Sequence, residues 1–573
     1  MRGTQGTGVN RTHGIGAIGR RVASVSTAAA VWLTGAFGAG NAAAQVAAPP
    51  APEPPAQLVP STVPPAPPVV EVRQYLVLGV TLLDAATVEA ALVGMTGQRS
   101  VEELHRAAGT VQALYARAGY GAVVVYLPPQ EVSGGVITLQ AIEGRIAAVR
   151  VEGSSRAFDA AGIVAGLPAL QLGQTPRLDR VDIQLRMAND NPAKRTRLVL
   201  LPGRQPDETE AEINVESAAR HQLALELENS GTPATGKARV GVAWRDANLS
   251  GRDDVVELRV QTAPDRPRRF SAASVTYRLP VVRYSTMFDA YALVADTQSD
   301  QVTTSAGNLS FAGRGHLLGL RATRFLARMA AFDPRVSLAL ERRDQRNQCT
   351  IGSLPEGACG SAGGDLAITP LLLEFSLAGE SPVPLALSVA LVQGLAWGGD
   401  RSSREAFDAV RPGARSVFTA LRAQLSAQQR LNAAGWAASA RIAGQWSADP
   451  LVPAMQFGAG GRSSVRGYEE RELAADHGVA LSLELSAPTW QVPPWPGSTW
   501  RPLLFLDAAA LRNRDPATCS GTQTHCNLAG TGVGVRFDAA SVSISLDVAH
   551  ALRDAGSTSA GRTRAHLWVR LVH

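Results

Sequence analysis

The stretch 541–548 reads SVSISLDV, and its residues alternate strictly between two chemical classes. Val542, Ile544, Leu546 and Val548 are aliphatic, whereas the residues between them are serine or aspartate. Side chains two positions apart in a β-strand lie on the same face. The alternation therefore predicts a strand with one apolar face and one polar face.

The same alternation recurs over the last 351 residues, from residue 223 to residue 573. It is clear in 223–228, 479–486 and 533–538, where leucine, valine or phenylalanine occupies every second position. A soluble β-sandwich would turn the aliphatic face inward, whereas a membrane β-barrel would turn it toward lipid. The length of the segment and the Glu, Asp and Arg among its polar positions favour the barrel, whose lumen is wet.

The first 44 residues predict a secretory signal peptide. Their only charges are four arginines between Arg2 and Arg21, which precede an apolar segment at 22–40 and the small residues of 41–44. This order is typical of a cleaved export signal, although a single membrane-anchoring helix is the alternative. The sequence after it has no run of eighteen apolar residues, which excludes later helical spans but permits a barrel.

The charge balance argues against nucleic acid as a partner. The chain has 55 Lys+Arg against 49 Asp+Glu, a formal net charge of +6. Without the four arginines of the signal peptide, 51 basic residues face 49 acidic ones, so the exported chain is nearly neutral. Binding to a phosphate backbone depends on clustered positive charge. We therefore expect no nucleic-acid partner.

A spacer and two copies of one small module are predicted before the barrel. Residues 45–69 are rich in proline and almost uncharged, as in a semi-rigid polyproline spacer. Residues 70–145 show the order strand, short helix, longer helix, strand, strand. Residues 146–222 repeat that order, which indicates two tandem α+β modules.

Local signals place individual elements within the two modules. The alternation over 70–78 predicts one strand at the start of the first module. Ser100 with Glu103 forms a capping box, which predicts that the longer helix begins there. In the second module, Thr175 followed by Pro176 predicts a capped helix start with proline in the first turn.

The four cysteines form two close pairs, Cys349 with Cys359 and Cys519 with Cys526. Each pair lies in a polar stretch, which in an exported protein indicates a small disulfide-closed loop. Zinc is the alternative because His525 adjoins Cys526, but neither pair has the tight spacing of structural zinc sites. We expect two disulfides and no metal.

Motifs of common enzyme classes are missing from the sequence. It contains no G-x-x-x-x-G-K-[ST], no H-E-x-x-H and no G-x-S-x-G. Its nine histidines are scattered along the chain. We therefore expect that the protein is not an enzyme and binds no cofactor.

Several motifs resemble the two-partner-secretion transporters of Gram-negative bacteria, the hemolysin activation/secretion proteins. The stretches LYARAGY at 114–120, LPPQEV at 127–132 and EGRI at 143–146 are similar to the first POTRA domain of that family. GRSSVRGY at 461–468 is similar to the motif on the long lumenal loop of the wider superfamily of polypeptide-transporting barrels. FLDAA at 505–509 resembles the barrel-wall motif F-x-D-x-G, with alanine in place of the glycine.

The resemblance implies a fold of two POTRA modules followed by a transmembrane antiparallel β-barrel. The modules occupy 70–145 and 146–222, and the barrel occupies 223–573 with about sixteen strands. At about 22 residues for each strand and its connection, the segment is long enough for strands of about 9–11 residues. One long lumenal loop is expected around 458–475.

The resemblance also implies which residues fix the lumenal loop. The loop motif consists of Val465, Arg466, Gly467 and Tyr468, and the wall motif supplies Phe505 and Asp507. We expect Arg466 to pair with Asp507 and hold the loop inside the lumen, because an arginine–carboxylate fork fixes orientation with two parallel bonds. Glycine lets the backbone turn beside the arginine.

The resemblance further implies export of a partner exoprotein with an N-terminal secretion domain. The POTRA modules in the periplasm would capture this chain unfolded, and the pore in the outer membrane of a Gram-negative bacterium would pass it outward without nucleotide hydrolysis. Outer-membrane lipid and the barrel-assembly machinery are the other expected partners. Two alternatives stay open: an outer-membrane protein assembly or insertion factor of the same superfamily, and a passive porin.

Overall fold

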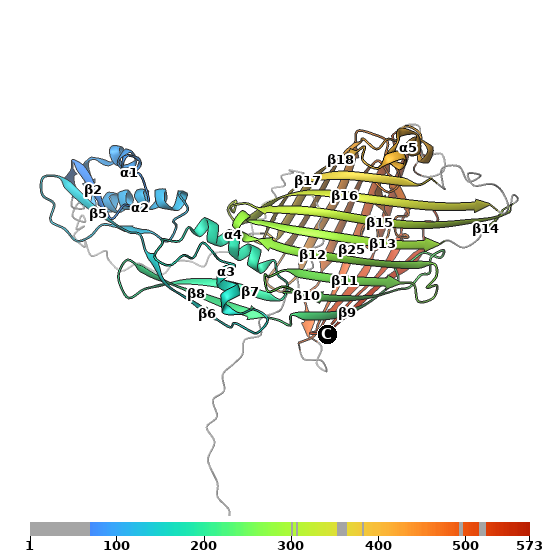
Figure 1. The fold of residues 1–573 in the computed structure, drawn as a ribbon, viewed down its shortest axis with the longest axis horizontal. Helices are drawn as coiled ribbons and strands as arrows, with labels where there is room; N and C mark the ends of the chain where they lie inside the picture. The colour runs from blue at the N-terminus through green and yellow to red at the C-terminus, as the bar shows by residue number, and fades with distance from the viewer. Residues whose placement is uncertain are drawn as a thin grey trace, which may run out of the picture.

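Two small α+β modules lead into one large barrel (Figure 1). The structure, a computed structural model, describes residues 69–298, 302–304, 307–351, 364–380, 383–491, 497–514, 519 and 523–573. The predicted signal peptide and all of the predicted spacer except Val69 lie outside these residues. Among the described helices, none is both long and apolar enough to cross a membrane.

The barrel is a closed antiparallel sheet, which confirms the predicted fold class. Of its eighteen segments, β14 (Val302–Thr304) and β24 (Trp490–Gln491) continue the lines of β13 and β23, which leaves sixteen strands. The sixteen strands are β9 His221–Glu228, β10 Arg239–Asp246, β11 Val255–Thr262, β12 Phe270–Val281, β13 Thr286–Gln298, β15 Gly307–Phe325, β16 Phe332–Ile351, β17 Leu366–Gly379, β18 Leu385–Leu395, β19 Thr419–Arg430, β20 Ala437–Ser447, β23 His477–Ser486, β25 Thr499–Arg512, β26 His525–Asp538, β27 Val542–Ala551 and β28 Thr563–Val572.

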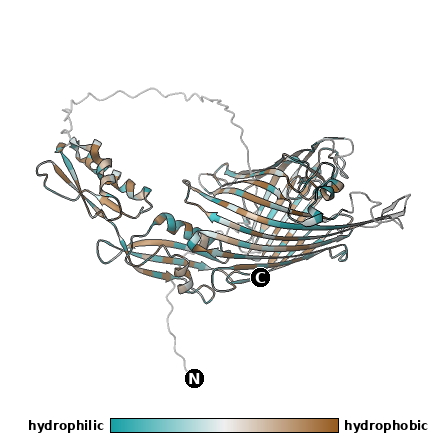
Figure 2. Cartoon of the chain, turned by 45° about the horizontal axis from the view of Figure 1, so that its top comes forward, coloured by the Kyte–Doolittle hydropathy of each residue, from teal (hydrophilic) through white to brown (hydrophobic). Residues whose placement is uncertain are grey.

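The sequence alternation separates the two faces of the barrel wall. On β27, Leu546 and Val548 are 38% and 40% exposed on the outer surface, whereas Ser545 and Asp547 are 5% and 1% exposed. Figure 2 shows apolar and polar residues alternating along the strands. Closure occurs where β28 pairs with β9. The sheet therefore presents an apolar outer face, a largely polar inner face and no free edge.

The first module packs two helices on a three-stranded sheet. Its elements are β1 Val69–Val72, β2 Gln74–Leu78, α1 Ala85–Leu92, η1 Val93–Met95, β3 Gly97–Ser100, α2 Val101–Arg117, β4 Val124–Tyr126 and β5 Val136–Ile142. The sheet has the order β2-β5-β4, with β5 parallel to β2 and antiparallel to β4. Tyr115, Ile137 and Leu139 are fully buried in its core.

The second module repeats this topology. Its elements are β6 Arg145–Glu152, α3 Ala160–Ala165, α4 Leu178–Asn189, β7 Lys194–Pro202 and β8 Glu208–Ser217. The sheet order is β6-β8-β7, and the last strand again lies in the centre, parallel to the first. The predicted internal repeat thus corresponds to a repeated arrangement of strands and helices.

Two local predictions for the modules are wrong. The stretch 70–78 forms two strands in different sheets, because the chain turns at Arg73, whose N–H donates to Gly135 O at 2.7 Å. Helix α4 begins at Leu178 without a side-chain cap, and the hydroxyl of Thr175 instead donates to Glu143 O at 3.0 Å. By contrast, the predicted capping box of Ser100 is present at the start of α2.

Charged contacts fix the second module to one end of the barrel. Asp190 follows α4, and its two carboxylate oxygens lie 2.8 Å from Arg278 Nη1 and 2.9 Å from Arg335 Nη1. Lys194 Nζ lies 2.5 Å from Asp253 Oδ2. We call this end, with the turns at 247–254 and 326–331, the module end, and the opposite end the far end. Connections at the far end face away from the modules (Figure 1).

A buried carboxylate, Glu143, joins the end of β5 to helix α2 and to the segment that precedes α1. Glu143 accepts hydrogen bonds from the hydroxyl of Thr81, from the Tyr115 hydroxyl at 2.6 Å, and from the N–H groups of Thr81 and Leu82 at 2.8 and 3.0 Å. Burial alone would raise the pKa of Glu143, but these bonds hold that pKa below its ordinary value. Burial and the bond to Glu143 raise the pKa of Tyr115.

We expect Glu143→Gln to destabilise the first module by about 1.5–3 kcal/mol, because its donors lose a charged acceptor. Hydrogen exchange of the α1 and α2 amides in the purified full-length protein measures this loss, and Glu102→Gln, on the exposed face of α2, is the control. Because folding lowers the pKa of Glu143, its contribution is present above the unfolded pKa of about 4.3 and disappears as the pH falls through the folded value. Equal exchange in both variants would contradict this prediction.

Candidate functional site

The connection between β20 and β23 folds back against the inner wall of the barrel. At its base β21 (Phe457–Ala459) pairs with β22 (Leu473–Ala475), so residues 460–472 form a closed loop. We call residues 460–472 the latch loop. Val465 and Tyr468 of this loop are fully buried in one cluster with Ala509 of β25 and Leu528 of β26. The alanine that replaces glycine in the wall motif therefore belongs to the contact between loop and wall.

Arg466 forms a two-pronged ion pair with Asp507 of β25. Arg466 Nε donates to Asp507 Oδ2 at 2.7 Å and Nη2 donates to Oδ1 at 2.8 Å, and the backbone N–H of Arg466 also donates to Oδ2 at 3.0 Å. Arg466 is 4% exposed and Asp507 is completely buried. The guanidinium carbon of Arg466 lies 3.5 Å from the centre of the Phe505 ring, a cation–π contact.

Further charges surround this fork. Arg466 Nη1 donates to Glu484 Oε1 at 2.7 Å and lies 3.4 Å from Asp547 Oδ1. Arg536 Nη1 lies 2.9 Å from the same oxygen of Asp547. Arg466 and Arg536 thus lie among three carboxylates, those of Asp507, Glu484 and Asp547. Because a buried charge without a partner is strongly destabilising, the carboxylates depend on Arg466 remaining in place.

The two residues after Arg466 fit the loop to the wall through backbone contacts. Gly467 has φ +99°, a conformation that side-chain-bearing residues rarely adopt, and its N–H donates to His566 Nε2 at 3.1 Å. The Tyr468 hydroxyl lies 2.9 Å from the carbonyl oxygens of both Ala529 and Arg553. The loop motif therefore spans from β25 to β28 across the inner wall.

The structure also reveals wall residues that the sequence reasoning missed. β26 has glycine at three successive inward positions, Gly530, Gly532 and Gly534. A Cβ atom on Gly530 would lie 2.1 Å from Arg466 O, and one on Gly534 would lie 2.2 Å from Asp547 Oδ1. These glycines therefore leave the space that the latch loop and its charges occupy. The sequence pattern that indicates them is the run GTGVGV at 530–535, in which glycine occupies every second position.

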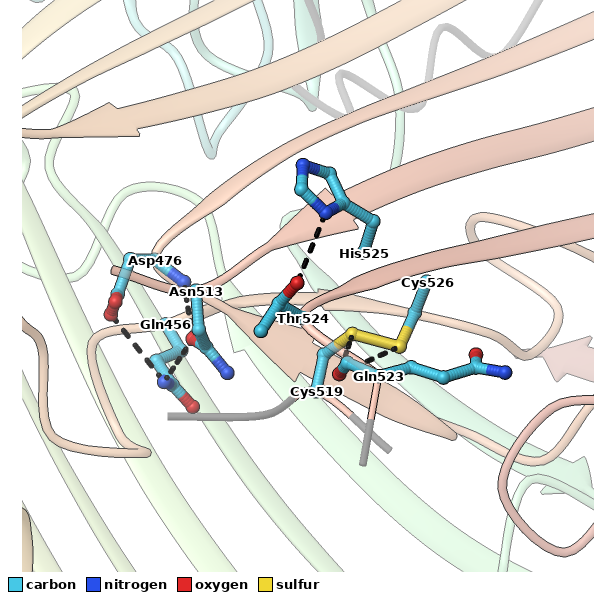
Figure 3. The surroundings of a disulfide bond; sticks show 8 residues. All are labelled: Gln456, Asp476, Asn513, Cys519, Gln523, Thr524, His525 and Cys526. Atoms are coloured by element: carbon cyan, nitrogen blue, oxygen red, sulfur yellow. Dashed lines mark hydrogen bonds between the residues drawn. A yellow bond between two sulfur atoms is a disulfide. The ribbon is translucent and has the colours of Figure 1, made fainter. Parts of the chain in front are cut away.

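One of the two predicted disulfides lies close to this site. The Cys519–Cys526 bond closes the connection between β25 and β26 (Figure 3). The neighbouring His525 Nδ1 lies 3.1 Å from Thr524 Oγ1. The expected bond between Cys349 and Cys359 falls outside the residues whose side chains are described. Within the described residues, no group of three His, Cys, Asp or Glu side chains could hold a metal ion.

Comparison with known proteins agrees with this geometry. The family model of the haemolysin secretion/activation proteins ShlB/FhaC/HecB matches residues 207–537, more than half of the chain. The chain belongs to this family. A POTRA domain of the ShlB type matches residues 70–144.

Relatives of this family share most of the chain at low identity. The heme/hemopexin transporter protein HuxB of Haemophilus influenzae is 23% identical over 465 residues, which cover 79% of this chain and 78% of HuxB. The hemolysin transporter protein ShlB of Serratia marcescens is 25% identical over 418 residues, which cover 71% and 70%. The structure of CdiB from Escherichia coli matches with a TM-score of 0.76 at 18% identity and covers 90% of this chain and 93% of CdiB. The two proteins therefore share a fold.

We expect Gly530→Ala to loosen the latch loop, because the new methyl group would collide with Arg466 O. Overpacking of this kind costs about 1–3 kcal/mol, so trypsin should cleave after the loop arginines about tenfold faster in the folded barrel. Gly315→Ala on β15 is the matched control, since a Cβ atom there meets nothing within 4 Å. If trypsin cleaves Gly530→Ala and Gly315→Ala at the same rate as the unmodified protein, Gly530 does not help to position the latch loop.

Proposed function

We propose that this protein exports one partner exoprotein through the outer membrane as an unfolded chain, as a transporter rather than an enzyme. The observation that carries the proposal is a loop fixed inside a closed barrel by a buried arginine–carboxylate fork, after a POTRA-type module. A passive porin needs a lumen that stays open, whereas a polypeptide pore needs a closed resting state. Membership of a secretion family supports the same conclusion.

In this proposal the modules lie in the periplasm and capture the exoprotein by its N-terminal secretion domain. The three-stranded sheets of the two modules end in the edge strands β2 and β4, and β6 and β7. An extended chain can add to such an edge through backbone hydrogen bonds, which require no particular sequence along the captured segment. The second module, held on the barrel by Asp190 and Lys194, would then deliver the chain to the module end of the lumen.

The proposal also assigns the surroundings of the barrel. The aliphatic outer face, with Leu546 and Val548 exposed on β27, would contact outer-membrane lipid. The cell's barrel-assembly machinery would insert the protein. The closed sheet needs no further protein partner to satisfy its edges.

Deletion of this protein should remove one large exoprotein from the culture medium and leave the other secreted proteins unchanged. Comparison of the secreted proteins of matched strains by mass spectrometry measures this, with re-expression of the unmodified protein as the control. Depletion of many outer-membrane proteins would support an assembly factor instead. Altered permeability to small solutes without any missing exoprotein would support a porin.

Arg466→Glu should reduce secretion of the exoprotein at least tenfold, because it places a fourth carboxylate among Asp507, Glu484 and Asp547. The folded barrel should still be detectable as a heat-modifiable band in electrophoresis. Arg314→Glu, an equal charge change at an exposed side chain that forms an ion pair with Asp296, is the control and should secrete normally. Normal secretion by Arg466→Glu would disprove the latch.

A further inference from the structure

A second connection covers part of the inner wall at the far end. Residues 396–418 join β18 to β19 and contain η4 (Gly399–Ser402) and the short helix α5 (Arg404–Val410), which lies beside β18 in Figure 1. Phe407 and Phe418 of this α5 connection are buried in one cluster with aliphatic wall residues. Those wall residues are Leu366 and Ile368 of β17 and Val392 of β18.

This cover explains why the wall beneath it is apolar. On β18, Leu391 is 44% exposed on the outer surface, so the neighbouring Val392 points inward, where it is completely buried. Aliphatic side chains on a water-filled lumen would lose the free energy of burial, about 1.5–3 kcal/mol each. The α5 connection therefore belongs to the packed structure of the barrel.

Arg411, directly after α5, connects this cover to the latch loop. Both of its terminal nitrogens donate to the carboxylate of Asp476, and Nη1 also donates to Leu451 O at 2.5 Å. Asp476 directly follows β22, at the point where the latch loop rejoins the wall. Arg411 is largely buried and Asp476 is completely buried. The pair is thus a second desolvated arginine–carboxylate fork.

Asp476 also forms hydrogen bonds with neighbouring segments at the far end. Its Oδ1 accepts the N–H of Leu451 at 2.9 Å, and its Oδ2 accepts the N–H of Arg514 at 2.9 Å. Its own N–H donates to Asn513 Oδ1 at 3.1 Å. Figure 3 shows Asp476 beside Asn513 and Gln456, near the disulfide-closed connection. Three segments at the far end therefore meet at one carboxylate: the α5 connection through Arg411, residues 448–476 through Leu451, and Asn513 with Arg514 directly after β25.

We propose that the Arg411–Asp476 pair is a second latch, which keeps the pore closed by tying the α5 connection to the stem of the latch loop. Arg466, at the tip of that loop, binds Asp507 of the wall. Arg411 of the α5 connection binds Asp476, which lies at the stem of the loop directly after β22. Each fork is buried, so the loss of either arginine leaves a desolvated carboxylate with fewer partners. Opening of the far end then requires release of the α5 connection as well as the loop. This inference concerns the resting state of the pore and goes beyond the identity of the exported chain.

Conductance of the purified full-length protein in planar lipid bilayers, without any exoprotein, tests the second latch. We expect Arg411→Gln to raise the frequency of opening about tenfold or more, because loss of the fork leaves Asp476 without its charged partner. Arg411→Lys keeps the charge but loses the fork, so it should show a smaller increase. Arg404→Gln removes an exposed arginine from the same helix and should behave like the unmodified protein.

Heat-modifiable migration shows which variants contain a folded barrel, and conductance is compared among those. If Arg411→Gln does not fold, the opening frequency of Arg411→Lys tests the proposal instead. Unchanged opening in the folded Arg411 variants would overturn the proposal, and so would an equal increase in Arg404→Gln. Because no exoprotein is present, this result is independent of whether the secretion experiments succeed.

Discussion

Every backbone N–H and C=O in the hydrocarbon layer needs a partner within the protein, because no water is available there. A sheet can meet that requirement only by closing on itself, and here β28 pairs with β9 to complete the ring. Closure fixes the direction of each side chain along the wall. One face then meets lipid and the other encloses a lumen, which must be filled with water or with the protein's own chain.

The protein fills part of this lumen with charged loops, and buried charge determines where they lie. Arg466 is surrounded by Asp507, Glu484 and Asp547, so moving the loop would separate one guanidinium from several carboxylates at once. The wall accommodates this arrangement with Gly530 and Gly534 at positions where any side chain would collide. The loop position is therefore defined jointly by attraction between charges and by the absence of side chains on β26.

The barrel was predictable because a period of two is a local property that every strand repeats. The pairing of Arg466 with Asp507 was accessible through resemblance, since both lie in recognisable motifs. The partner of Arg411 was not, because Asp476 lies 65 residues away in an undistinguished stretch and the chain contains many similar arginines. The helix start at Thr175 was mispredicted because its hydroxyl bonds to Glu143 O in a contact between modules. Such contacts between distant segments leave no pattern in a sequence read locally.

A pore that works without nucleotide hydrolysis needs a closed state that is well defined but not deeply stable. Buried ion pairs suit this requirement, because the desolvation of both charges offsets most of their attraction. A hydrophobic contact of similar area would lack the directional bonds that place Arg466 on Asp507. When such a fork opens into a wet lumen, both charges regain water, so release is far less unfavourable than separation within a dry core. In the proposed closed state, the two forks at the tip and the stem of one loop would combine a defined geometry with a modest barrier to opening.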